Sequence, residues 1–121
     1  AYERIALRDK LRSDGLIHAR RHRAHYMWPW EKEPTSQASG ILDDETYDWF
    51  SIAQGLIESK GHAVAVSEDL IEEARRQGQE SCGIRVDATG TAGLAGLLSL
   101  RHDTLCNPDE ESVVLFTGAI R

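Results

Sequence analysis

The amino-acid sequence predicts an α/β fold in which a small sheet is flanked by helices. Three short runs are rich in strand-forming residues, at 63–66, 84–86 and 112–117. Apolar residues recur at helical spacing in three longer segments, near 45–59, 68–77 and 90–101. This alternation over 121 residues is typical of one small α/β domain. We therefore expect residues 41–121 to form the α/β segment, preceded by residues 1–40 as an N-terminal arm.

The arm combines helical and extended patterns. Residues 2–12 place a few apolar side chains among charged ones, which predicts a helix that Gly15 ends. A second short helix is expected over 16–25. Residues 26–34 cannot form a regular helix, because two prolines and the residues before them favour extended geometry. The aromatic side chains of this stretch either cover their own domain or contact a partner chain or a missing domain.

Capping residues indicate where the helices of the α/β segment begin and end. Asp43 or Asp44 is expected to cap the helix near 45–59, and Lys60-Gly61 is expected to end it.

The next two helices carry similar signals. Ser67 is expected to cap a helix over 68–77, with acidic residues in its first turn and Gly78 as its stop. Asp87 or Thr89 is expected to cap the last helix. Glycines recur every third residue at its start, which indicates close packing more than a nucleotide-binding loop, because the spacing of such loops is absent.

The final strand is expected to be buried. Residues 113–116 form an unbroken apolar run, which suits a strand covered on both faces. The run ends in Thr117-Gly118, which places a hydroxyl and a permissive backbone at the carboxyl end of the strand. Ligands of open α/β sheets bind at that edge. Thr117 is therefore a candidate binding residue.

Two motifs of the last third resemble a known enzyme family. The turn Asp87-Ala88-Thr89-Gly90-Thr91-Ala92 and the strand end Phe116-Thr117-Gly118 are similar to the C-terminal end of threonine synthase-like, fold-type-II pyridoxal-phosphate-dependent enzymes. The resemblance extends upstream through Ser39-Gly40-Ile41-Leu42 and Val64-Ala65-Val66-Ser67-Glu68. It covers residues 25–118, by pattern more than by identity.

The resemblance implies that the chain is a C-terminal fragment of a pyridoxal 5′-phosphate-dependent lyase or synthase of amino-acid metabolism. It implies that Thr117 and Gly118 bind the cofactor, with the Thr117 hydroxyl hydrogen-bonded to the pyridine nitrogen. It also implies a turn on the substrate side of the cleft, made of Asp87, Thr89, Gly90 and Thr91. The expected partners are an amino-acid substrate and either a missing N-terminal portion or further copies of the chain.

Several features of that family are absent from the sequence. The family holds its cofactor as a Schiff base on a lysine in a Ser-x-Lys-type motif, and Lys10, Lys32 and Lys60 lie in no such motif. The Gly-rich phosphate cradle is also missing, and Asp87-Ala88 replaces the usual Glu-Pro. We therefore expect no catalytic residue in this chain and no cofactor on the isolated chain. The alternative is a non-catalytic α/β interaction or regulatory module.

Charge and composition narrow the remaining classes of function. The net charge of −6 argues against nucleic acid as the main partner, and no apolar run is long enough to span a membrane. The basic cluster at 20–25 is either a solvated helix face or arm, or a patch for an anion or nucleic acid. His18 and His22 share helical spacing, but neighbouring arginines oppose a metal there. Cys82 and Cys106 form no CxxC pattern, which favours structural thiols in a reducing cytoplasm.

Overall fold

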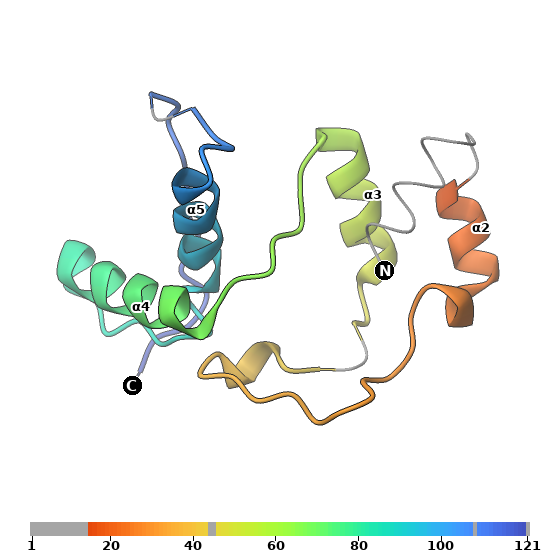
Figure 1. Ribbon diagram of the computed structural model, residues 1–121, viewed down its shortest axis with the longest axis horizontal. Helices are drawn as coiled ribbons and strands as arrows, with labels where there is room; N and C mark the ends of the chain where they lie inside the picture. The colour runs from red at the N-terminus through yellow and green to blue at the C-terminus, as the bar shows by residue number, and fades with distance from the viewer. Residues whose placement is uncertain (1–14, 44–45, 108, 121) are drawn as a thin grey trace. The chain divides into compact units, whose positions relative to one another are not determined.

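The computed structural model describes residues 15–43, 46–107 and 109–120, which form helices joined by extended and turn segments (Figure 1). These residues contain no β-strand, and a single antiparallel bridge joins Val86 to Ala119. The predicted α/β fold, with a sheet built from 63–66, 84–86 and 112–117, is therefore wrong. A strand needs backbone hydrogen bonds to a neighbouring strand, so an apolar run without such a neighbour is only extended. The helix predicted over 2–12 lies outside the described residues.

Two compact units divide the chain. One comprises Ala1–Glu33 and Asp43–Ala63, and the other comprises Pro34–Leu42 and Val64–Arg121. We name them the α2–α3 unit and the α4–α5 unit after their helices, and each is described by itself.

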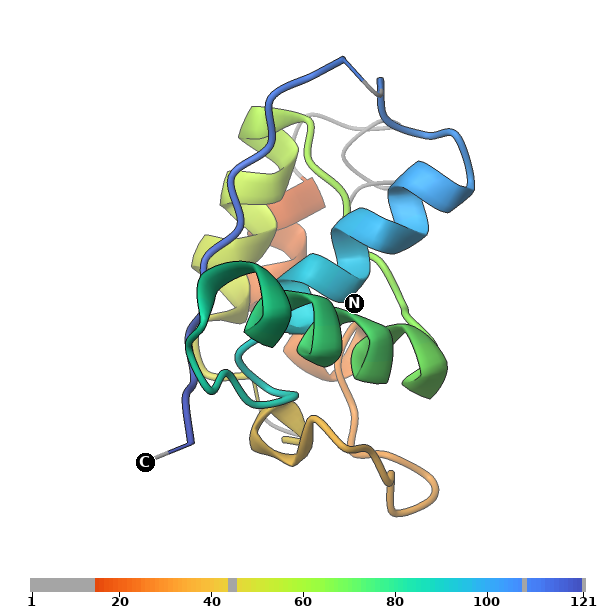
Figure 2. The same ribbon diagram turned by 90° about the vertical axis from the view of Figure 1, so that its left-hand side faces the viewer.

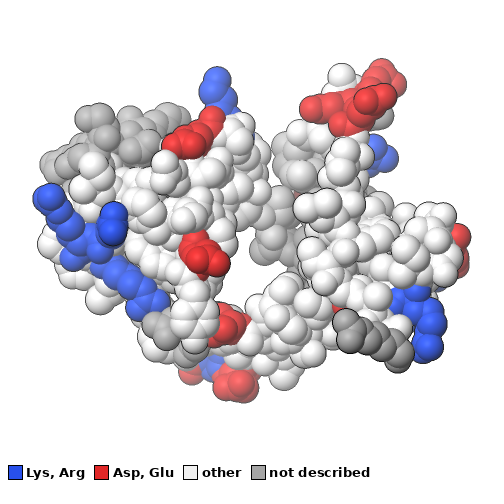
Figure 3. All heavy atoms as spheres, turned by 180° about the vertical axis from the view of Figure 1, so that it is seen from behind, with Lys and Arg blue, Asp and Glu red and all other residues white. Residues whose placement is uncertain are grey.

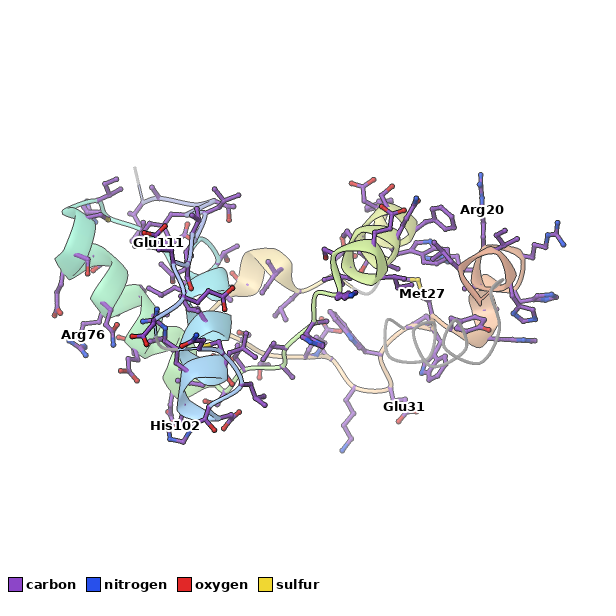
Figure 4. The ribbon with its side chains drawn as sticks, turned by 90° about the horizontal axis from the view of Figure 1, so that it is seen from above. Arg20, Met27, Glu31, Arg76, His102 and Glu111 are labelled. Atoms are coloured by element: carbon purple, nitrogen blue, oxygen red, sulfur yellow. The ribbon has the colours of Figure 1, made fainter. Side chains whose placement is uncertain are left out.

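The α2–α3 unit packs two helices around a small core. Its elements are α2 (Gly15–Arg21), the 3-10 turn η1 (Arg23–His25) and α3 (Trp49–Ser59). The core consists of buried and half-buried apolar residues from all three parts: Leu16, Ala19, Tyr26, Met27, Trp49, Ala53 and Ile57. Figure 4 shows the Met27 side chain directed between α2 and α3. The helix predicted over 16–25 is thus present as α2 followed by η1.

Helix α3 ends where the sequence predicts and begins later. Lys60 adopts the left-handed conformation with φ of 56°, and the Gly61 N–H donates to the Leu56 carbonyl at 2.8 Å, which closes the last turn. The helix begins at Trp49 with Asp48 at its N-cap position, so the prediction that Asp43 caps it is wrong, and Asp44 lies outside the described residues. Trp49, Ala53 and Ile57 pack in the core of the unit, as their helical spacing predicts.

The α4–α5 unit is built on two helices that cross (Figure 2). Its elements are the 3-10 turn η2 (Ser39–Ile41), α4 (Glu68–Cys82) and α5 (Ala92–His102). Small side chains dominate the core: Ala38, Ile71, Ala74, Ala88 and Ala95, with Val66, Leu70, Leu94 and Leu98 packed around them. Small residues allow the two helices and the preceding loop to approach closely.

Helix α4 begins as predicted and runs past its predicted stop. The Ser67 hydroxyl accepts from the Leu70 N–H at 3.3 Å, which is the expected cap. The helix continues through Gly78 to Cys82, and Gly83 ends it with φ of 67°. Gly78 is buried, and a Cβ placed there would lie 3.2 Å from the Phe116 ring. Gly78 therefore provides space for Phe116 and does not end the helix.

Candidate functional site

Two of the motifs found in the sequence meet at the turn 87–91, which precedes α5. The Asp87 N–H donates to the Gly118 carbonyl at 3.4 Å, and the Thr117 N–H donates to the Gly90 carbonyl at 3.3 Å. A Cβ on Gly90 would overlap the backbone of Gly118, so the absence of a side chain permits this approach. The predicted cofactor-binding and substrate-side residues are therefore neighbours in space, although 26 positions separate Thr91 from Thr117 in the chain.

The upstream motif reaches the same turn. The Gly40 N–H donates to the Thr89 hydroxyl at 3.0 Å. A Cβ on Gly40 would lie 2.9 Å from the Thr89 methyl carbon, so this contact also depends on glycine. Three of the four segments that carry the resemblance thus meet at one turn. Residues 39–42 contact it at Thr89, and residues 116–118 contact it at Asp87 and Gly90.

Hydrogen bonds within the turn fix its shape. The Asp87 carboxylate accepts from the Gly90 N–H at 2.6 Å. The Thr91 hydroxyl donates to the Asp87 carbonyl at 2.9 Å, and Thr91 is completely buried. These polar groups satisfy each other at the start of α5, where free N–H groups would otherwise remain. The side chains of Asp87 and Thr91 therefore hold the turn in place.

The Thr117 side chain differs from those of the turn. Thr117 is exposed, and within the described residues its hydroxyl has no hydrogen-bond partner. The backbone N–H groups of Ala88 and Thr89 likewise have no acceptor in the part of the chain that the structure describes. A free hydroxyl can accept from or donate to a ligand, and free N–H groups suit a carboxylate. The arrangement therefore offers polar contacts to a small polar molecule.

Pyridoxal phosphate fits these residues in part. The free Thr117 hydroxyl suits a ring nitrogen, which needs one hydrogen-bonding partner. Among the described residues, no lysine or arginine side chain forms an ion pair or hydrogen bond with residues 87–91 or 117–118, so these segments provide no cationic contact for a phosphate. The turn and the segment end at 117–118 could therefore contact the ring, while the phosphate and the covalent lysine need other groups.

Two interactions that support the site were not found from the sequence. The Gln79 side chain donates to the Val86 carbonyl at 2.8 Å and so holds the start of the turn against α4. The Glu68 carboxylate accepts from the Gln37 N–H at 2.9 Å, which ties the loop before Gly40 to α4. This backbone hydrogen bond, together with one from the Ser36 side chain, lowers the pKa of Glu68 from its usual 4.5. Both interactions join residues that are too far apart in sequence for capping rules or apolar periodicity to relate them.

Other polar clusters lie away from this turn. Arginines gather over α2 on the face shown in Figure 3, and the Arg20 guanidinium lies 5.2 Å from the centre of the Phe50 ring. The rings of His18 and His22 lie 4.3 Å apart, yet the described residues contain no group of side chains able to hold a metal. A shallow pocket of about 450 Å³ follows α5, and it contains none of the predicted site residues.

No protein-family model, curated protein or solved structure matches this chain. None of the helices in the described ranges combines the length and apolar character that crossing a membrane requires.

Proposed function

We propose that this chain supplies the carboxyl-terminal part of a pyridoxal-phosphate-dependent lyase or synthase, similar to threonine synthase, that acts on amino acids. The observation that supports the proposal is that three of the four motif segments meet at the turn 87–91. Chance similarities scattered along a chain have no reason to meet, whereas parts of one binding site must do so.

Thr117 and the turn have separate roles in this proposal. The Thr117 hydroxyl binds the pyridine nitrogen, and Gly118 keeps the backbone close to the turn. The cofactor supplies an electron sink, and a neutral hydroxyl at its nitrogen makes that sink weaker than a carboxylate would, which suits elimination and replacement reactions. The free N–H groups of Ala88 and Thr89 bind the substrate carboxylate, and the Asp87 and Thr91 side chains maintain their position.

The rest of the active site comes from outside this chain. Lys60 forms the carboxyl-terminal cap of α3, and neither it nor Lys32 lies in a motif that would carry the cofactor. The partner in this proposal is the part of the enzyme that carries the lysine and the phosphate site. The location proposed is the cytoplasm, where the free thiols of Cys82 and Cys106 remain reduced.

The proposal is tested with Thr117 variants in the complete enzyme. Thr117→Ser keeps the hydroxyl and should keep most activity. Thr117→Val keeps the shape and removes a hydrogen bond, which costs about 1–3 kcal/mol, or about ten- to a hundredfold in kcat/KM if it stabilises the transition state. Steady-state kinetics, with cofactor occupancy measured separately, give the answer. If Thr117→Val leaves rate and cofactor affinity unchanged, the proposed function loses its residue-level support.

A helical interaction or regulatory module is the second candidate. It is favoured by the exposure of large apolar side chains, with Val113 at 91% and Leu115 at 76%. Such a module would not respond to the Thr117 hydroxyl at all. Equal behaviour of Thr117→Ser and Thr117→Val would therefore favour it.

A further inference from the structure

Residues 112–116 form an extended segment whose backbone is unpaired. Within the described residues, none of the N–H or C=O groups of this segment has a hydrogen-bond partner. The chain regains backbone contacts only from Thr117 onward, at the turn 87–91 and at the bridge between Val86 and Ala119. Unpaired extended backbone of this kind is a template for the strand of another chain.

The side chains of the segment already alternate as those of a strand do. Val114 faces α5, with its γ carbon 3.7 Å from the position of a Cβ on Gly93, and Phe116 packs at Gly78 of α4. Val113 and Leu115 point the other way and are 91% and 76% exposed. One face of the segment is therefore seated on its own helices, while the other presents two large apolar side chains to solvent.

The charges beside the segment favour one orientation for a second strand. Asp109, Glu110 and Glu111 precede it, and all three are exposed; Figure 4 labels Glu111. Arg85 lies beside Ile120, four residues past the other end of the segment, where the Arg85 carbonyl accepts from the Ile120 N–H at 2.7 Å. Two copies side by side in parallel would place like charges together. In an antiparallel pair, the acidic end of each copy lies toward Arg85 of the other.

We propose that two copies of this chain associate through residues 112–116, which pair as antiparallel strands about a twofold axis near Val114. Val113 of each copy then lies opposite Leu115 of the other, and the outward apolar side chains cover one another. The pairing supplies partners to the unpaired backbone groups and leaves the contacts of Val114 and Phe116 with α4 and α5 intact. It does not depend on the proposed enzymatic function.

Sedimentation velocity over a range of concentrations tests the pairing. The chain should form dimers, and Leu115→Arg should raise their dissociation constant about tenfold or more, because it removes two symmetric cross-strand pairs. Leu105→Arg is the matched control: Leu105 is 72% exposed but lies outside the segment, so this variant should dimerise normally. Leu115 faces solvent, so circular dichroism of Leu115→Arg should match that of the parent chain.

Amide hydrogen exchange locates the interface. Residues 112–116 should exchange more slowly as dimers form, and this protection should disappear in Leu115→Arg. A chain that stays monomeric, or a dimer indifferent to Leu115→Arg, would overturn the proposal. The proposal would also be overturned if residues 112–116 became protected from exchange only when the cofactor-bearing part of an enzyme is added. The strand that pairs with the segment would then belong to that part and not to a second copy.

Charge reversal tests the orientation. Asp109→Lys should weaken the dimer at low salt, because the twofold axis near Val114 places Asp109 opposite Ala119, next to the Ile120 that contacts Arg85. Adding Arg85→Glu should restore part of the affinity, because the opposite charges are then exchanged. This gain in affinity should disappear at high salt, because salt screens the attraction between exposed charges. A dimer equally strong in Asp109→Lys and in the parent chain at low salt would contradict the antiparallel arrangement.

Discussion

Helix α4 and the segments around the turn 87–91 lie in the same unit but are stabilised in different ways. Helix α4 satisfies its polar groups locally, with the Ser67 cap, the left-handed Gly83 and the ion pair between Arg76 and Glu80 at 3.0 Å. The turn depends on residues far away in sequence, since Gly40 and Gly118 both contact it.

The difference shows which substitutions should disrupt the unit most. Removing one local hydrogen bond from α4 lowers the free energy of unfolding by the contribution of that bond alone and leaves the helix in place. A change at the turn acts on three segments at once, because they contact one another there. The expected effects of the following substitutions therefore fall in order, from the turn to the helix.

The largest effect is expected for Gly90→Ala. The added methyl group would overlap the carbonyl and amide of Gly118, and backbone cannot move aside as a flexible side chain can. Overpacking of this kind costs about 1–3 kcal/mol in the free energy of unfolding, measured by urea denaturation.

Gly96→Ala is the matched control in α5. Nothing lies within 4 Å of the position that its Cβ would occupy. Alanine is favoured over glycine in a helix by up to about 1 kcal/mol, so this variant should be as stable as the parent or more stable. If both glycine variants gave the same stability, the close approach at Gly90 would not exist in solution.

A smaller effect is expected for Ser67→Ala. The substitution removes the hydroxyl that accepts from the Leu70 N–H, and removal of such a cap costs about 1 kcal/mol of unfolding free energy. Ser81→Ala, an exposed position within the same helix, should cost nothing, because alanine is the better helix former. The amides of residues 117–118 should exchange at the same rate in Ser67→Ala and in the parent chain, as long as exchange does not require global unfolding. Equal rates would show that the helix cap and the turn are independent. Faster exchange of these amides in Ser67→Ala would show that the two are coupled.

The smallest effect concerns pH, at the hydrogen bond that joins the two regions. The pKa of Glu68 is lowered by the Gln37 N–H, so its contribution to stability is fully present above the unfolded value of 4.5 and disappears as pH falls through the lower folded value. The Gln37 amide should therefore lose protection from exchange in that acidic window. Glu68→Gln should remove the pH dependence of this amide, whereas Asp69→Asn should leave it unchanged. A Gln37 amide whose protection is the same in the parent and in Glu68→Gln would rule out the tether.

The sequence by itself determined the features that arise within a few residues. The Ser67 cap and the end of α3 at Lys60 agree with prediction, because capping and glycine conformations depend on immediate neighbours. Helix α5 lies where it was expected, but Thr91 stands at its N-cap position, so the prediction that Asp87 or Thr89 caps it is wrong. The motif residues of the candidate site were also named from the sequence. Their meeting at one turn could be expected only through resemblance, because no local rule relates Gly40 or Thr117 to Thr89.

Only the tertiary structure decided the roles of the apolar runs and of the buried glycine. Val113–Phe116 has strand composition, but a strand requires a neighbour, and within the described residues the one bridge in this region joins Ala119 to Val86. Gly78 was expected to stop the helix, yet α4 continues through it. The glycine leaves room for the Phe116 ring, which lies 3.2 Å from the position of a Cβ. Both results depend on residues distant in sequence: the apolar run lacks a neighbouring strand, and the Phe116 ring packs against Gly78.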